Sequence, residues 1–222
     1  MRPTPDRRRK ETEEPIARAA ALDDAALLSI LLGSPAAAPP QDRPARGLLA
    51  RFGSLGEVLA APARELHRIE GVGPEVVERL ALTRELGFRL ARSRALADSL
   101  PSGWSALVGY VRTRLASLTR ERFLALFLDA DDRLVAEELV AEGTVDHAPV
   151  YPREVVRRAL EVSASGLVLV HNHPSGDPAP SRADIAVTRL IVEAAAVFDL
   201  RVHDHLIVAR EGTASFRALG LM

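Results

Sequence analysis

The sequence predicts an α/β domain, a mixed sheet flanked by helices, preceded by an all-α N-terminal region. In the second half of the 222-residue chain, short apolar runs alternate with amphipathic helical patterns, as in a sheet covered by helices. In the first half, leucines recur at helical spacing. We expect a helical domain over residues 15–100 and the sheet domain over residues 101–222. The first 14 residues, rich in Pro, Arg and Glu, are expected to form a flexible tail.

Composition narrows the class of protein. The net charge of −1 gives no general attraction for nucleic acid. The chain has no cysteine, so a bound metal would need histidine and carboxylate ligands. No stretch reaches the about 18 apolar residues of a membrane-spanning helix, and no signal-peptide pattern follows the basic run at residues 7–10. We expect a cytoplasmic protein with no membrane partner, and the sequence leaves its oligomeric state open.

The N-terminal half is expected to form helices joined by turns. Asp23 is a candidate N-cap for a helix that ends at Gly33, and a proline-rich loop is expected over residues 34–46. Gly71 and Gly73 then form a tight turn between two helices, which resembles a helix-hairpin-helix module that binds the DNA backbone. The alternative is a purely architectural turn, because a carboxylate such as that of Glu75 repels phosphate.

The C-terminal half alternates helices and strands. A Pro-Ser-Gly break at residues 101–103 is the expected domain boundary. The expected elements are a helix at 104–118, strands at 122–129 and 134–140 that form a hairpin, a helix at 151–164, a strand at 167–171, a helix at 181–198 and a strand at 201–209.

Two histidines stand at the end of the most apolar of these strands. Side chains two residues apart on a strand point to the same face, so His171 and His173 converge while Asn172 faces away. After a loop rich in proline, Ser181 opens a helix and Asp184 lies in its first turn, where its carboxylate can supply a third ligand. Two nitrogens, one oxygen and an open position suit a catalytic Zn²⁺. Ser181 and Asp184 also fit a capping box, and the two uses are compatible.

This pattern resembles the JAMM metal site of the JAB/MPN proteins, in which His-x-His is followed after seven residues by Ser and after two more residues by Asp. Two segments are similar to the RadC branch of this family, long labelled as DNA-repair proteins. They are His-Asn-His-Pro-Ser-Gly-Asp-Pro-Ala-Pro-Ser at residues 171–181 and Asp-His-Leu-Ile-Val at residues 204–208. This resemblance implies a JAB/MPN-like fold and a zinc-dependent hydrolase that cleaves a peptide or isopeptide bond.

The resemblance also implies two catalytic residues. A glutamate upstream of the histidines acts as the general base, and Glu121 matches its position. A charged strand edge is the alternative explanation for Glu121, and its competitors as base are Glu137, Glu138 and Glu142. Ser181 would donate a hydrogen bond to the developing oxyanion, worth about 3 kcal/mol, or serve as an N-cap worth about 1 kcal/mol.

The last strand carries further polar residues. We expect Asp204 and His205 to support the metal ligands from behind or to be structural, with Asp204 orienting a ligating imidazole. His203 and Tyr151 depart from the residues common in the family.

Three functions remain open from the sequence. The leading hypothesis is a JAMM-type zinc metallohydrolase, with DNA as a possible partner of its helical domain. The first alternative is a DNA-repair factor or nuclease, and the second is a non-catalytic JAB module for protein contacts. The substrate is left open, because fold alone does not specify it.

Overall fold

The computed structural model describes residues 19–33, 43–97, 99–100, 102–143 and 150–222. The tail expected at residues 1–14 and most of the loop expected at 34–46 lie outside these residues. The chain divides into two compact units, Met1–Leu86 and Gly87–Met222. This division falls inside one long helix, α6 (Pro74–Ala97), whereas the sequence pattern placed the boundary after that helix.

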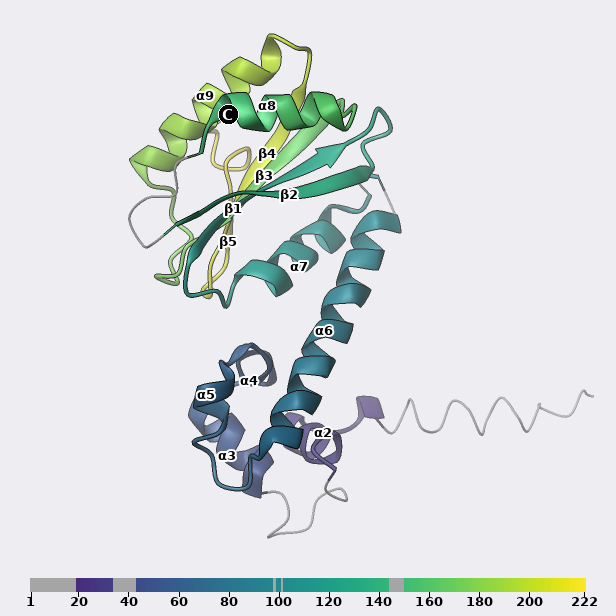
Figure 1. Cartoon of the computed structure of the whole chain (residues 1–222), viewed down its shortest axis with the longest axis vertical. Helices are drawn as coiled ribbons and strands as arrows, with labels where there is room; N and C mark the ends of the chain where they lie inside the picture. Colours follow the sequence, from purple (N-terminus) through teal and green to yellow (C-terminus); the bar gives the residue numbers. More distant parts are fainter. Residues whose placement is uncertain (1–18, 34–42, 98, 101, 144–149) are drawn as a thin grey trace, which may run out of the picture. The chain divides into compact units, whose positions relative to one another are not determined.

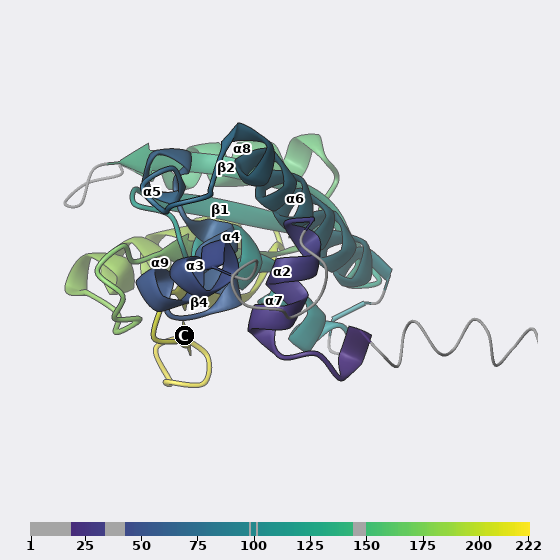
Figure 2. The ribbon, with the colours of Figure 1, turned by 90° about the horizontal axis from the view of Figure 1, so that it is seen from below.

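The first unit is helical. It contains α2 (Asp24–Leu31), α3 (Arg43–Phe52), α4 (Leu55–Ala60), α5 (Ala63–Leu66) and the first half of α6. Leucines and valines of these helices form one buried cluster, and α3 lies beside both α2 and α4 (Figure 2). Asp23 caps α2, as predicted, by accepting a hydrogen bond from the backbone of Ala26. Helix α3 begins inside the expected loop because a proline in the first helical turn removes no helical hydrogen bond.

The second unit is the predicted mixed α/β domain. Its five strands lie in the order β2-β1-β3-β4-β5, with antiparallel pairs except for the parallel pair β3 and β4. Their bounds are β1 (Glu121–Leu128), β2 (Leu134–Gly143), β3 (Gly166–Asn172), β4 (Arg201–Val208) and β5 (Thr213–Ser215). Strands β1 and β2 form the expected hairpin, and every residue of β3 is buried.

Helices cover both faces of this sheet (Figure 1). Helix α7 (Trp104–Leu115) packs on one face, together with apolar residues of the second half of α6, namely Phe88, Ala91 and Ala95. Helices α8 (Pro152–Glu161) and α9 (Arg182–Ala196) pack on the other. The sheet therefore separates two buried clusters, and the second half of α6 belongs to the sheet unit because its apolar residues complete one of them.

Several bounds differ from the expectation. Helices α7 and α8 end three residues early, at Leu115 and Glu161, and strand β2 continues three residues further, to Gly143. Strand β5 was not predicted, because three residues are too few to show an alternating pattern. Among the described residues, no helix combines the length and apolar character needed to cross a membrane.

Strand β1, which lies between β2 and β3, should contribute strongly to the stability of the sheet unit. Leu126 is fully buried there, whereas Leu139 on the edge strand β2 is 43% exposed. We expect Leu126→Ala to lower the free energy of unfolding by about 2–5 kcal/mol. The same substitution at Leu139 should cost less than about 1 kcal/mol. Urea denaturation followed by the fluorescence of Trp104, the single tryptophan, measures both. Equal losses would contradict the assigned core.

Candidate metal centre

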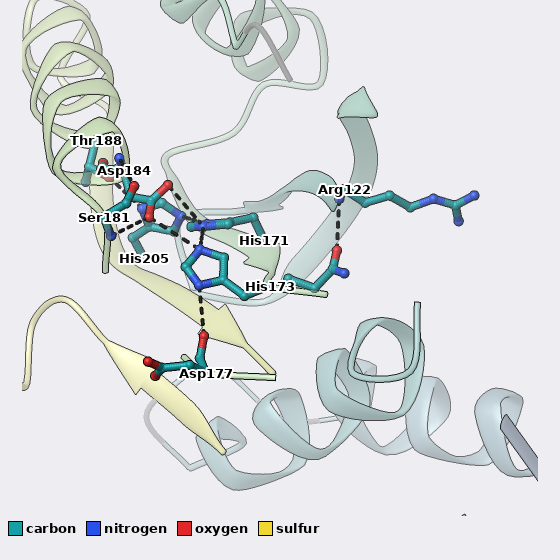
Figure 3. A network of polar contacts seen from close by, with 9 residues as sticks. Arg122, His171, His173, Asp177, Ser181, Asp184, Thr188 and His205 are labelled. Carbon is teal, nitrogen blue, oxygen red and sulfur yellow. Dashed lines mark hydrogen bonds and ion pairs between the residues drawn. The ribbon is translucent and has the colours of Figure 1, made fainter. Parts of the chain in front are cut away.

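The end of strand β3 brings two histidines to one point, because His171 lies in the strand and His173 directly follows its last residue. The Nε2 atoms of His171 and His173 lie 3.0 Å apart (Figure 3). Between them, Asn172 faces the other way, as predicted. Its side-chain oxygen accepts a hydrogen bond from the backbone of Arg122 (2.8 Å), and its amide donates to the carbonyl of Arg120 (3.0 Å). Asn172 thus links the end of β3 to the start of β1 through two hydrogen bonds. With Asn172 held on one side of the strand, its neighbours His171 and His173 point to the other side.

The first turn of α9 brings a carboxylate to the same point. Ser181 and Asp184 form the predicted capping box: Ser181 Oγ accepts from the Asp184 amide (3.1 Å), and Asp184 Oδ2 accepts from the Ser181 amide (2.7 Å). The same carboxylate lies 3.2 Å from His171 Nε2 and 3.4 Å from His173 Nε2. The loop that joins β3 to α9 turns back through Gly176, whose φ of +101° is readily adopted only by glycine.

Glu121, the first residue of β1, completes the group. One ligand atom from each of Glu121, His171, His173 and Asp184 lies within 4.8 Å of all the others. The three glutamates that compete with Glu121 in the sequence make ion pairs elsewhere. Glu137 pairs with Arg114, Glu138 with Arg158, and Glu142 with Arg120 and Arg122.

The tautomer of His173 follows from its neighbour. Its Nδ1 lies 3.0 Å from the backbone carbonyl oxygen of Asp177. A carbonyl oxygen can only accept, so Nδ1 carries a proton. In the neutral imidazole, the lone pair is then on Nε2 and points at the centre of the group.

The tautomer of His171 is fixed by a longer chain of hydrogen bonds. Thr188 donates its single hydroxyl proton to the carbonyl of Asp184 (2.5 Å), so its oxygen must accept from Nδ1 of His205 (2.6 Å). Burial lowers the pKa of His205 well below its usual value, so this ring is neutral and its Nε2 is an acceptor. His171 Nδ1 therefore donates to His205 Nε2 (2.7 Å), which leaves the lone pair of His171 on Nε2.

This donor set fits a metal ion. Two lone pairs directed at each other across 3.0 Å repel, unless a proton or a cation lies between them. Ligands about 2.0–2.1 Å from a tetrahedral ion are separated by roughly 3.3 Å. His171 Nε2 lies 3.0 Å from His173 Nε2 and 3.2 Å from Oδ1 of Asp184, while His173 Nε2 lies 3.4 Å from the other carboxylate oxygen, Oδ2. Two imidazole nitrogens and the carboxylate of Asp184 could therefore hold one metal ion, with Glu121 beside it.

Without a metal, protons hold the group together. Burial alone would raise the pKa of Asp184, but hydrogen bonds from His171 and His173 outweigh it and hold that pKa far below its usual range. The hydrogen bond to Asp184 is the main reason that the pKa of His173 is raised, and the charge of Glu121 adds to it.

The other predicted residues lie as follows. The hydrogen bonds of Asp204 fit the structural alternative expected for it rather than the orientation of an imidazole. Its carboxylate accepts from the backbone amides of His205 and Arg217 and from the Ser215 hydroxyl. The side chain that reaches His171 is that of His205. Thr188 was missed, because the only sign of its role is that it follows Asp184 by one helical turn.

The glycine turn lies in the other unit. Gly71 has a φ of +81° and stands between α5 and α6, so the predicted tight turn is present. Its DNA-binding role, and that of Gly73, stay predictions.

The fold and the site together define a JAB-type domain with a potential metal centre. Residues 102–221 match the family model described as "RadC-like JAB domain". The chain is 52% identical over 206 residues to a "UPF0758 protein" of Rhodobacter capsulatus, and the match covers 92% of this chain and 95% of that protein. The chain therefore belongs to the RadC family.

The contact between His173 and Asp184 should make a pH-dependent contribution to the stability of the metal-free protein. The low pKa of Asp184 contributes stability above pH 3.8, the ordinary value for aspartate, and this is lost as the pH falls. The raised pKa of His173 contributes stability below pH 6.5, the ordinary value for histidine, and this is lost as the pH rises. We expect the contribution of this pair to the free energy of unfolding, after chelation, to be greatest between about pH 4 and pH 6.5. The lowered pKa of His205 acts in the opposite direction below pH 6.5, so the contribution is measured as the difference between the wild type and Asp184→Asn, which keeps a capping side chain and leaves His205 in place. A difference that does not change with pH would contradict the coupling.

The His205 contact should tune metal affinity. His205→Leu leaves the Nδ1 proton of His171 without an acceptor, so the affinity for Zn²⁺ or Co²⁺ should fall by about 10–100-fold. His205→Gln should restore much of it, because an amide can accept from His171 and donate to Thr188 at once. Competition with a chromophoric chelator measures both, with His67→Gln as a histidine control from the helical unit. Equal losses in the Leu and Gln variants would refute the tautomer argument.

Proposed function

We propose that this protein is a zinc-dependent hydrolase that cleaves an amide bond in a peptide or isopeptide. The observation that carries this proposal is the convergence of two imidazole lone pairs, the Asp184 carboxylate and the Glu121 carboxylate on one point. Family membership supports the same reaction class. A zinc ion bound there would supply a water of lowered pKa and polarise the carbonyl of the scissile bond.

Each residue of the group then has a separate task. His171, His173 and Asp184 hold the ion. Glu121 lies next to them without a role in the capping box, and its carboxylate takes the proton of the attacking water and returns it to the leaving amine nitrogen. The leaving amine needs a proton, and Glu121 has just taken one from the water. The same carboxylate can therefore serve as base in the first step and as acid in the second.

Ser181 can serve the site without losing its structural role. Its oxygen accepts the hydrogen bond from the Asp184 amide. A hydroxyl that accepts one hydrogen bond still has a proton to donate. We propose that this proton stabilises the negative charge that develops on the carbonyl oxygen of the substrate, a contribution of about 3 kcal/mol in comparable sites.

Zinc content and turnover test the proposal together. We expect about one zinc per chain, as for a three-ligand site of this type, and its loss in His171→Ala/His173→Ala. Glu121→Gln should keep the zinc but lower turnover by about 10²–10⁴-fold, because it removes the base alone. Elemental analysis and a library of internally quenched peptides and lysine-linked isopeptides measure the two effects.

Glu142→Gln is the matched control, because Glu142 pairs with Arg120 and Arg122, which flank Glu121 in the sequence. It should leave turnover unchanged. Zinc in the wild type with no turnover on either library would favour a non-catalytic module, and cleavage of DNA instead would favour the nuclease alternative.

A further inference from the structure

A cavity lies on the face of the sheet opposite the metal centre. It has a volume of about 370 Å³, within the range typical of small-molecule sites. Consecutive residues of β4 separate it from the metal centre: the side chain of Asp204 lines the cavity, while that of His205 reaches His171. Helix α7, which covers this face, contributes Trp104. The cavity is therefore a separate site and shares no ligand with the metal centre.

One part of the cavity wall is apolar. The half-buried indole of Trp104 forms an aromatic surface, and Leu100 and Ala218 add aliphatic area. A flat aromatic molecule could stack on an indole and remove this area from water.

The two carboxylates of the cavity wall, those of Asp204 and Asp132, already have hydrogen-bond or ion-pair partners in the protein. The Asp204 carboxylate accepts three hydrogen bonds and is only 3% exposed as a residue. Asp132 pairs with His203, with 3.0 Å between Oδ1 and Nε2. Gly166 leaves room for the ring of His203, because a Cβ at position 166 would lie only 2.6 Å from Nε2.

The wall also contains a cationic group, the guanidinium of Arg217. One guanidinium nitrogen of Arg217 donates to the carbonyl of His203 (3.3 Å). Within the part of the chain that the structure describes, Arg217 has no carboxylate partner. A guanidinium presents five N–H donors, so most of them remain for a ligand, and planar anions such as carboxylates match their geometry.

We propose that this cavity binds a small planar aromatic molecule that carries one anionic group. The aromatic part lies against Trp104, and the anionic group pairs with Arg217. This site does not depend on the hydrolase activity, because none of its residues belongs to the metal centre.

Binding of 1-naphthoate, a planar aromatic carboxylate, tests the proposal by calorimetry on the full-length, zinc-loaded protein. Saturable binding is expected. Arg217→Gln should weaken it by about tenfold, the loss of one charge-assisted hydrogen bond. The same variant should leave binding of the neutral 1-naphthalenemethanol within about twofold, since that compound has no charge to pair. Trp104→Leu should weaken both compounds, and Trp104→Phe should restore both.

Two control variants test whether 1-naphthoate binds in this cavity. Arg189→Gln removes an exposed arginine from α9, on the other face of the sheet, and should change nothing. His171→Ala/His173→Ala should also leave 1-naphthoate binding unchanged, which separates this cavity from the metal centre. The proposal is overturned if 1-naphthoate does not bind, if its binding is lost with the two histidines, or if 1-naphthylmethylammonium binds more tightly.

Discussion

The structure of the candidate site depends on one constraint: two imidazole lone pairs point at each other across 3.0 Å inside the protein. Each lone pair is there because the opposite ring nitrogen is committed, that of His173 to a backbone carbonyl and that of His171 to His205. Such an arrangement is unfavourable unless something positive occupies the centre. Asp184 adds negative charge at the same point. The group is therefore built to hold a cation, which is a proton when no metal is bound.

The fold holds these groups at their positions with elements that have other structural roles. Strand β3 is buried throughout, so its end cannot move without disturbing both clusters that pack on the sheet. Asp184 closes the capping box of α9 with the same carboxylate that faces the histidines. Helix formation and assembly of the site are thus coupled, because loss of the helix start would also remove a ligand.

The sequence predicted the parts of the site that lie close together in the chain. His171, His173, Ser181 and Asp184 follow from strand periodicity and helix capping, while Glu121 needed the family resemblance because it is 50 residues away from His171. The contact between His205 and His171 could not be predicted, because it depends on the parallel register of β3 and β4, in which Leu169 pairs with His205. The sequence named both Asp204 and His205 as possible supports of the ligands, and the structure shows that His205 reaches His171 while Asp204 lines the opposite face of the sheet. The cavity beside Trp104 is likewise formed by segments far apart in the chain.

The central claim is that His171 and His173 bind a metal through Nε2, together with Asp184. X-ray absorption at the zinc edge of the metal-loaded protein tests it most directly. The account predicts two imidazole nitrogens and oxygen ligands, all at about 2.0–2.2 Å, with the imidazole contribution lost in the variant that lacks both histidines. A zinc surrounded by oxygen alone, or a spectrum unchanged by removal of the two histidines, would contradict it.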